Sequence, residues 1–233
     1  MTFGTIRTTR TTIFYDLTNK HWEAVRITSV GWTIEKAPII FRRHNTQPQV
    51  HPSKEYPSDI FDRFMNLLNV KGEQTKLLIK CYIIALFIPE IDKPILMLHG
   101  DPAGAKSTME ELMKTLVDPS SVLTFALPRD NVELVQQLDH NHVVYYDNVS
   151  KMPDWISDQF CRASTGGGSS KRRLYTEDDD KIYNFKRCVG FNGVNLAATK
   201  SDLLDRGLII KVERIDDKAR RRKQHLYGVS LRR

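Results

Sequence analysis

Residues 94–108, PILMLHGDPAGAKST, constrain the fold of this chain more than any other stretch. An apolar run at 95–98 has the length of a short strand and leads into a loop that contains two glycines, followed by Lys106 and Ser107. The next residues carry apolar side chains at helical spacing, namely Met109, Leu112, Met113 and Leu116. Strand, glycine-bearing loop, Lys-Ser and helix, in this order, are typical of a phosphate-binding loop.

The chemistry of such a loop follows from its backbone. Its N–H groups and those of the helix N-terminus converge on one point and hold phosphate oxygens there. Lys106 would add a charge at the β- and γ-phosphates of ATP, and the Ser107 hydroxyl would bind Mg²⁺. The residues predicted to bind the nucleotide are Gly100, Asp101, Pro102, Ala103, Gly104, Ala105, Lys106, Ser107 and Thr108.

One residue of the loop departs from the usual pattern, which has glycine directly before the lysine. Ala105 stands there instead, and its Cβ is unfavourable if the position requires a positive φ. An ordinary strand-turn-helix in which Lys-Ser occurs by chance therefore remains an alternative.

The composition is that of a globular protein without a membrane span. The chain has 233 residues, of which 40% are hydrophobic, and the longest apolar stretch, at 77–88, is interrupted by Lys80. Three widely spaced cysteines form neither a metal-binding pattern nor a disulfide framework, so we expect a reducing cytoplasm. The net charge of +7 resides in the residues after Asp217, which could contact nucleic-acid phosphates or form a solvated helix end.

The chain divides into four expected segments. Residues 1–43 form a small β-rich cap, with a frayed start at 1–12 and strands at 12–17, 22–28, 31–35 and 37–42. Residues 44–90 are a connector and a helical pair, at 60–69 and 72–87. Residues 91–215 form the nucleotide-binding core, and residues 216–233 a basic tail.

Strands and helices alternate in the core, which predicts a mainly parallel α/β sheet flanked by helices. Expected strands lie at 122–125, 142–146, 187–191 and 207–212. Expected helices lie at 131–138, 153–164 and 201–204. A hairpin with arms at 171–175 and 181–185 follows a flexible run at 166–170.

The second signal is an apolar strand that ends in Asp147, 41 residues after Lys106, a spacing that suits a neighbouring strand. An aspartate at this place can hold Mg²⁺ in phosphate-loop ATPases, although a turn-forming Asp-Asn pair is the alternative. Asn148 occupies the place of a second acid, and an amide can orient water but cannot take its proton. Asp154 and Asp158, on the following helix, are possible substitutes.

Two further polar residues fit the same site. Asn192 follows a buried strand and could position water beside the γ-phosphate, or it could simply start an Asn-Gly turn. Arg206 could stabilise the transition state as an arginine finger in the nucleotide site of an adjacent subunit, or it could form a surface ion pair.

The hairpin carries Lys171, Arg172, Arg173 and Tyr175. Basic side chains beside an aromatic ring suit the phosphates and bases of single-stranded DNA. A solvated hairpin whose charge is balanced by its acidic turn is the alternative.

The ordered set GDPAGAKST, YYDN, STGGGSSKRRLYT, FNG and DLLDRGLII resembles the superfamily III and AAA+ helicase ATPases. It is most similar to the primase-associated helicases of plasmids, phages and poxviruses. The matching positions are Thr165-Gly166-Gly167, Arg173, Leu174-Tyr175, Asn192 and Asp202 with Asp205-Arg206. The loop GDPxxAKS is also similar to that of the minichromosome maintenance helicases, which have alanine before the lysine.

This resemblance covers residues 95–212, about half the chain, and implies the P-loop fold, ATP hydrolysis with Mg²⁺, a hexameric ring and movement along DNA. We therefore expect a helicase-like motor or remodeller that acts in the replication of a mobile element, plasmid or virus. The alternatives are a nucleotide-binding switch or scaffold with little hydrolysis, which Asn148 favours, and a small-molecule kinase. The chain could be a minimal ATPase or a piece of a larger replication protein.

Overall fold

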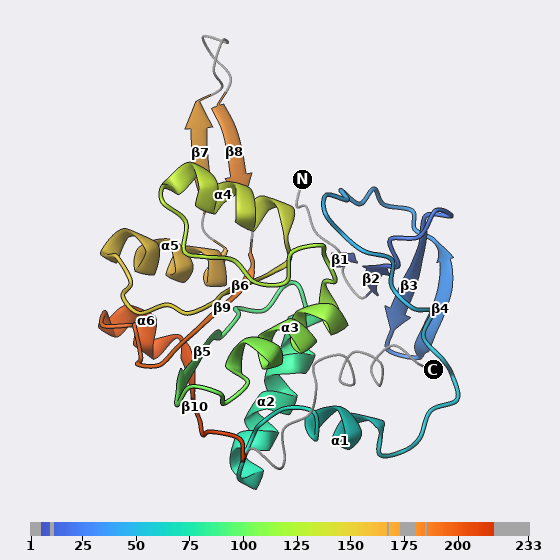
Figure 1. Cartoon of the computed structure of the whole chain (residues 1–233). Coiled ribbons are helices and arrows are strands. Elements are labelled where there is room, and N and C mark those ends of the chain that lie inside the picture. The colour runs from blue at the N-terminus through green and yellow to red at the C-terminus, as the bar shows by residue number, and fades with distance from the viewer. Residues whose placement is uncertain (1–5, 10–11, 167, 173–179, 185, 217–233) are drawn as a thin grey trace.

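A parallel four-stranded sheet lies at the centre of the molecule (Figure 1). The computed structural model describes residues 6–9, 12–166, 168–172, 180–184 and 186–216. The sheet has the order β10-β5-β9-β6, and every neighbouring pair is parallel. Its strands are β5 (Ile95–Gly100), β6 (Val143–Tyr146), β9 (Cys188–Gly193) and β10 (Gly207–Val212).

Helices cover both faces of this sheet. Successive residues of a strand point to opposite faces, so apolar residues that follow one another in β5 pack against different helices. Leu96 and Leu98 of β5 pack with the first three helices of the chain, whereas Ile95 and Met97 pack with the three that follow α3. The first set is α1 (Ile60–Met65), α2 (Glu73–Leu86) and α3 (Lys106–Val117), and the second is α4 (Asn131–His140), α5 (Asp154–Thr165) and α6 (Ser201–Asp205). This arrangement confirms the predicted α/β class with a mainly parallel sheet.

Two of the predicted helices differ in detail. The first ends at Met65 instead of residue 69, because Leu67 and Leu68 donate to carbonyls three residues back in successive turns. On α3, Leu116 was predicted to lie on the apolar face but is 39% exposed. The next residue, Val117, is buried instead.

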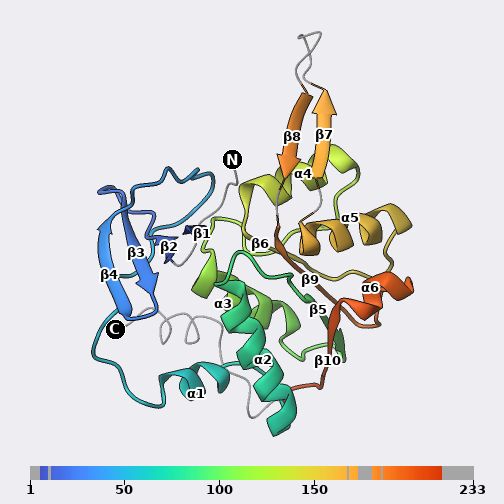
Figure 2. The same cartoon turned by 180° about the vertical axis from the view of Figure 1, so that it is seen from behind.

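A second sheet precedes the core and lies beside it (Figure 2). Its four antiparallel strands follow one another in sequence order: β1 (Ile6–Thr9), β2 (Thr12–Asp16), β3 (Glu23–Thr28) and β4 (Gly31–Lys36). Tyr15 joins it to the core, since its hydroxyl donates to the Val117 carbonyl at 3.0 Å.

The make-up of this sheet corrects two predictions. Residues 6–9, expected to fray, form β1, and residues 37–42, expected to form a strand, do not. Pro38 has no N–H to donate to a ladder, and Phe41 instead packs against Phe14 and Ala24.

The predicted strand at 122–125 is also wrong, because only Phe125 pairs with the sheet, through a single parallel bridge to Tyr146. Nearby backbone groups bond elsewhere: the Ser120 hydroxyl donates to Val122 O, and Ser121 N donates to Asn45 O. The sheet therefore ends at β6, with one bridge beyond it.

The expected hairpin consists of β7 (Gly168–Arg172) and β8 (Asp180–Asn184), which pair antiparallel and project away from the core (Figure 1). Residues 168–170, predicted to be flexible, belong to β7.

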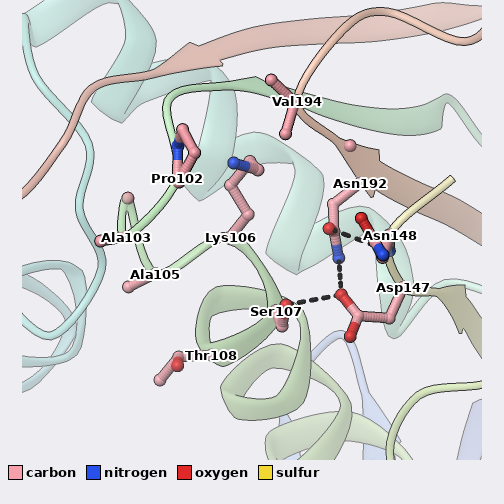
Figure 3. A pocket seen from close by; sticks show the side chains of 12 residues that line it. Pro102, Ala103, Ala105, Lys106, Ser107, Thr108, Asp147, Asn148, Asn192 and Val194 are labelled. Atoms are coloured by element: carbon pink, nitrogen blue, oxygen red, sulfur yellow. Dashed lines mark hydrogen bonds between the residues drawn. The ribbon is translucent and has the colours of Figure 1, made fainter. Parts of the chain in front are cut away.

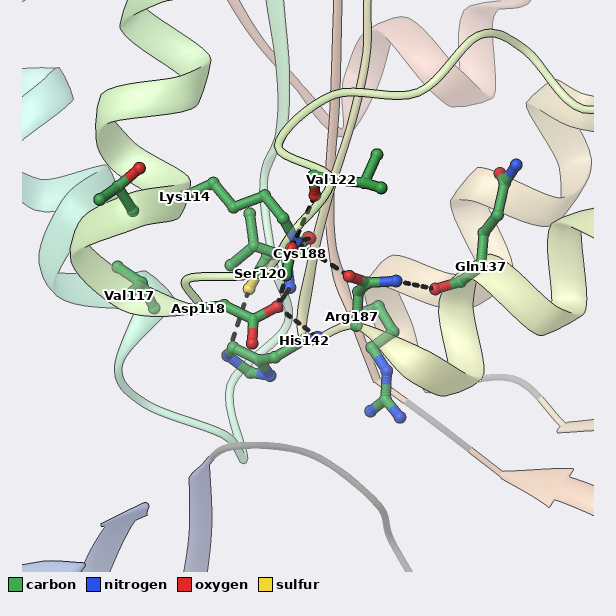
Figure 4. A network of polar contacts seen from close by, with 12 residues as sticks. Lys114, Val117, Asp118, Ser120, Val122, Gln137, His142, Arg187 and Cys188 are labelled. Carbon is green, nitrogen blue, oxygen red and sulfur yellow. Dashed lines mark hydrogen bonds and ion pairs between the residues drawn. The ribbon is translucent and has the colours of Figure 1, made fainter. Parts of the chain in front are cut away.

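A buried polar network fixes the C-terminal end of α3 (Figure 4). The Lys114 ammonium donates to Val143 O at 2.6 Å and to Asn141 Oδ1 at 3.1 Å, and it pairs with Asp118 at 3.3 Å. Asp118 in turn accepts the backbone N–H groups of His142 and Val143. Burial lowers the pKa of His142 to about 4, so the imidazole is neutral at pH 7. The network holds α3 against β6 at the end of the helix remote from Lys106.

Candidate nucleotide site

The carboxyl ends of β5, β9 and β6 meet at one edge of the sheet, which is where parallel α/β sheets bind ligands. The spacing predicted that the strand before Asp147 is the direct neighbour of β5. In the structure β9 lies between β5 and β6, so this prediction is wrong. A cavity of about 440 Å³ opens at this edge. Its lining comprises Pro102, Ala103, Gly104, Ala105, Lys106, Ser107, Thr108, Asp147, Asn148, Asn192, Gly193 and Val194.

The loop between β5 and α3 has an unusual backbone. Ala103 and Ala105 adopt positive φ angles of 64° and 62°, and Ala105 is the residue directly before the first turn of α3. Gly100 also has a positive φ, and a Cβ there would lie 2.1 Å from the Val212 carbonyl oxygen. Alternating left-handed residues turn successive N–H groups toward one side, which makes a concave anion-binding surface.

Lys106 lies across the base of this loop. Its ammonium donates to the carbonyls of Gly100 and Asp101, both at 2.8 Å. Burial lowers the pKa of Lys106, and the charge of Asp101 opposes this shift. Gly100 and Asp101 thus contact the lysine and are outside the lining of the cavity.

Ser107, Asp147 and Asn192 point toward one another (Figure 3). The Ser107 hydroxyl donates to Asp147 Oδ1 at 2.6 Å, and Asn192 Nδ2 donates to the same oxygen at 2.9 Å. The three residues come from α3, from the end of β6 and from β9. Residues far apart in sequence thus place a hydroxyl and a carboxylate side by side beside the loop.

Asn148 lines the cavity in a left-handed conformation, with φ of 55°. Its backbone N–H donates to Asn192 Oδ1 at 3.3 Å, and the next residue, Val149, donates to Asn192 O at 2.7 Å. The two proposed substitutes for a second acid lie outside the lining, since Asp158 and Asp154 face Lys200 at 2.8 and 3.9 Å.

Sequence reasoning missed Glu110, which lies one helical turn after Lys106 and is completely buried. Its Oε2 accepts from Asn192 Nδ2 at 2.6 Å, and its Oε1 has no partner among the described residues. Burial raises the pKa of Glu110 well above its ordinary value, the hydrogen bond from Asn192 lowers it, and the charge of Asp147 raises it. The sequence signal was an acid on the same helical face as Lys106.

Arg206 does not line this cavity. Arg206 precedes β10 at the opposite edge of the sheet, where it pairs with Asp202 and its carbonyl accepts Ile95 N–H. Lys171 and Arg172 belong to β7, and Arg173 and Tyr175 lie outside the described residues. No helix in the described parts of the chain is both long and apolar enough to cross a membrane.

Solved structures with a similar fold include the apo C-terminal region of NrS-1, with a TM-score of 0.50 and 14% identity over 77% of this chain and 45% of that one. The structure of the JCV helicase with a bound acetamide compound has a TM-score of 0.43 and 14% identity over 68% of this chain and 46% of that one. The chain thus spans less than half the length of these structures. At this identity the likeness concerns the fold alone.

Among curated proteins, no sequence matches the chain significantly. A family model described as actinomycete integrative conjugative element replication protein matches residues 61–230. This range runs from the second residue of α1 past the end of β10 and includes the whole cavity. The chain therefore belongs to the family of actinomycete integrative conjugative element replication proteins.

Proposed function

We propose that this replication protein binds ATP with Mg²⁺ in the cavity and hydrolyses it to act on DNA. The observation that carries the proposal is the contact of Ser107 with Asp147 directly beside the loop of Lys106. A nucleotide phosphate chain would lie along the loop, and Lys106 would exchange its carbonyl partners for phosphate oxygens. Hydrogen bonds from an ammonium to charged oxygens are stronger than those to neutral carbonyls, which favours this exchange.

The donor set fits a hard cation. Ser107 supplies a hydroxyl oxygen and Asp147 a carboxylate oxygen, and oxygen ligands are what Mg²⁺ prefers in proteins. When bound, Mg²⁺ would neutralise charge on the phosphates. The chain's own part is to hold these two oxygens beside the phosphate loop, with the amide of Asn192 fixing Asp147 from the other side.

A water molecule that attacks the γ-phosphate would be oriented by Asn148 and Asn192, which both line the cavity. Neither side chain can remove a proton. This observation favours a second candidate function, a nucleotide-binding switch or scaffold that hydrolyses ATP slowly. Tight ATP binding with negligible single-turnover hydrolysis would select the switch over the motor.

The partners belong to the same proposal. Single-stranded DNA would bind the projecting hairpin through Lys171, Arg172, Arg173 and Tyr175. Arg206 lies too far along the sheet to serve its own cavity, so as an arginine finger it would require a second copy of the chain, as in a hexameric ring. Membership in a replication family supports DNA as the partner.

Steady-state ATP turnover with and without single-stranded DNA tests this proposal. We expect stimulation by DNA, and loss of turnover in Lys106→Ala, which lacks the charge at the phosphates. Arg206→Ala should lose turnover while it keeps ATP affinity. Robust hydrolysis that is indifferent to DNA would contradict the nucleic-acid part, and loss of ATP binding in Arg206→Ala would indicate a structural role.

A further inference from the structure

Asn69 contacts the loop that joins β5 to α3, called the phosphate loop below, and is not among the residues that line the cavity. It lies between α1 and α2, is half-buried, and belongs to neither helix. Its Nδ2 donates to Gly104 O at 3.0 Å and to Glu213 O at 2.7 Å. Because both partners are carbonyl oxygens, only the amide NH₂ can make these bonds, and its two hydrogens satisfy both.

A second contact with the phosphate loop is made by the backbone that follows β10. Ile215 N donates to Ala103 O at 3.3 Å, just after β10 ends at Val212. The chain that leaves β10 therefore runs along the outer side of the loop, and Asn69 joins the two. The fit is close, since a Cβ on Gly104 would lie 3.0 Å from Glu213 O.

These outward bonds determine where the loop's N–H groups point. In a planar trans peptide, the C=O of one residue and the N–H of the next point in opposite directions. Holding Gly104 O outward thus directs the N–H of Ala105 inward, and holding Ala103 O outward does the same for the N–H of Gly104. Inward is toward the cavity, which Ala103, Gly104 and Ala105 all line.

We propose that Asn69 is a positioning residue of the phosphate loop, which by anchoring the Gly104 carbonyl aims the Ala105 N–H at the nucleotide phosphates. The inference rests on the proposed nucleotide site and names a residue for it outside the loop motif. Asn69 touches no phosphate itself. It stabilises the left-handed turn at Ala105, whose Cβ makes this conformation costly without support.

The competing explanation is that Asn69 only ties the segment between α1 and α2 to the segment that follows β10. The exposed ion pair of Lys71 with Glu213, at 2.6 Å, already joins the same two segments without touching the loop. The two roles make different predictions, because a structural tie affects unfolding and a positioning residue affects phosphate affinity.

The test is the dissociation constant of Mg–ATP and of Mg–ADP, measured by calorimetric titration on the full chain. Asn69→Ala removes one hydrogen bond to the loop and one to the chain that supports it, so we expect about five- to tenfold weaker binding of both nucleotides. Asn69→Asp keeps the size but not the donors, and should lose at least as much. Asn66→Ala, an exposed asparagine at the end of α1, is the matched control and should bind like the wild type.

The outcomes separate the two proposals. Wild-type chain that binds neither nucleotide overturns the nucleotide site itself. Wild-type binding with unchanged affinity in both Asn69 variants overturns only the positioning role. A drop in the thermal unfolding midpoint of Asn69→Ala with unchanged affinity would assign Asn69 to the structural tie. Weaker binding in both Asn69 variants, with Asn66→Ala like the wild type, supports the inference whether or not the midpoint falls.

Discussion

Ala105 carries backbone strain at the position directly before Lys106, where its φ of 62° and ψ of 28° are left-handed. An L-residue with a Cβ pays roughly 1–2 kcal/mol for this conformation, and glycine does not. The departure from the usual glycine therefore changes the energy of the loop and not its shape.

Replacing Ala105 with glycine tests this account at the scale of one residue. We expect Ala105→Gly to raise the free energy of unfolding by about 0.5–1 kcal/mol, because relief of strain exceeds the added entropy of the unfolded chain. Urea denaturation measures the change. Ala85→Gly, within α2, is the matched control and should lower stability by about 1 kcal/mol.

A loss of stability in Ala105→Gly similar to that in the control would mean that the left-handed turn is not strained in solution. It would also weaken the argument that Asn69 supports this turn.

At the scale of secondary structure, α3 connects the two polar regions of the core. Its first turn carries Lys106 and Ser107, its second carries Glu110 against Asn192 of β9, and Lys114 near its end belongs to the buried network. The Glu110 carboxyl is an unfavourable member of this set, because burial disfavours its charged form.

The pH dependence of unfolding reports on Glu110. Its pKa in the folded chain lies above the ordinary value of 4.5, so below that value the carboxyl is neutral in both states and costs nothing. As pH rises past it, the unfolded chain releases the proton first, and stability falls. Glu110→Gln cannot titrate and keeps an acceptor for Asn192, so its stability advantage over the wild type should grow from pH 4.5 toward neutrality.

Chemical denaturation of both chains across this pH range is the measurement. A difference that stays constant with pH would show that the Glu110 carboxyl titrates as it does in the unfolded chain.

Elements whose signals are local could be predicted from the sequence. The apolar run, the loop and α3 are contiguous, so their pattern alone specified strand, turn and helix. The segments at 37–42 and 122–125 have strand-like composition but no strand, since pairing depends on partners elsewhere: Pro38 blocks one ladder, and the other meets only the edge of β6. The order of the strands could not be predicted for the same reason, because nothing in the spacing placed β9 between β5 and β6.

At the scale of the whole molecule, the sheet assembles the candidate site from three distant segments. Lys106, Asp147 and Asn192 were each recognisable beside the strand that carries them, and the parallel topology brings them to one cavity. Asn69 had no sequence signal, because its role arises only where the connector after α1 meets the chain that leaves β10. Long-range contacts of this kind are set by tertiary packing and not by local pattern.

The central claim is that this cavity is a magnesium–nucleotide site, and equilibrium binding of ATP with and without Mg²⁺ tests it most directly. The wild-type chain should bind ATP more tightly with Mg²⁺, Lys106→Ala should lose at least about tenfold in affinity, which is 1.4 kcal/mol, and Asp147→Asn should lose the enhancement by Mg²⁺. Wild-type affinity in Lys106→Ala, an undiminished Mg²⁺ effect in Asp147→Asn, or no ATP binding by the wild type would contradict the claim.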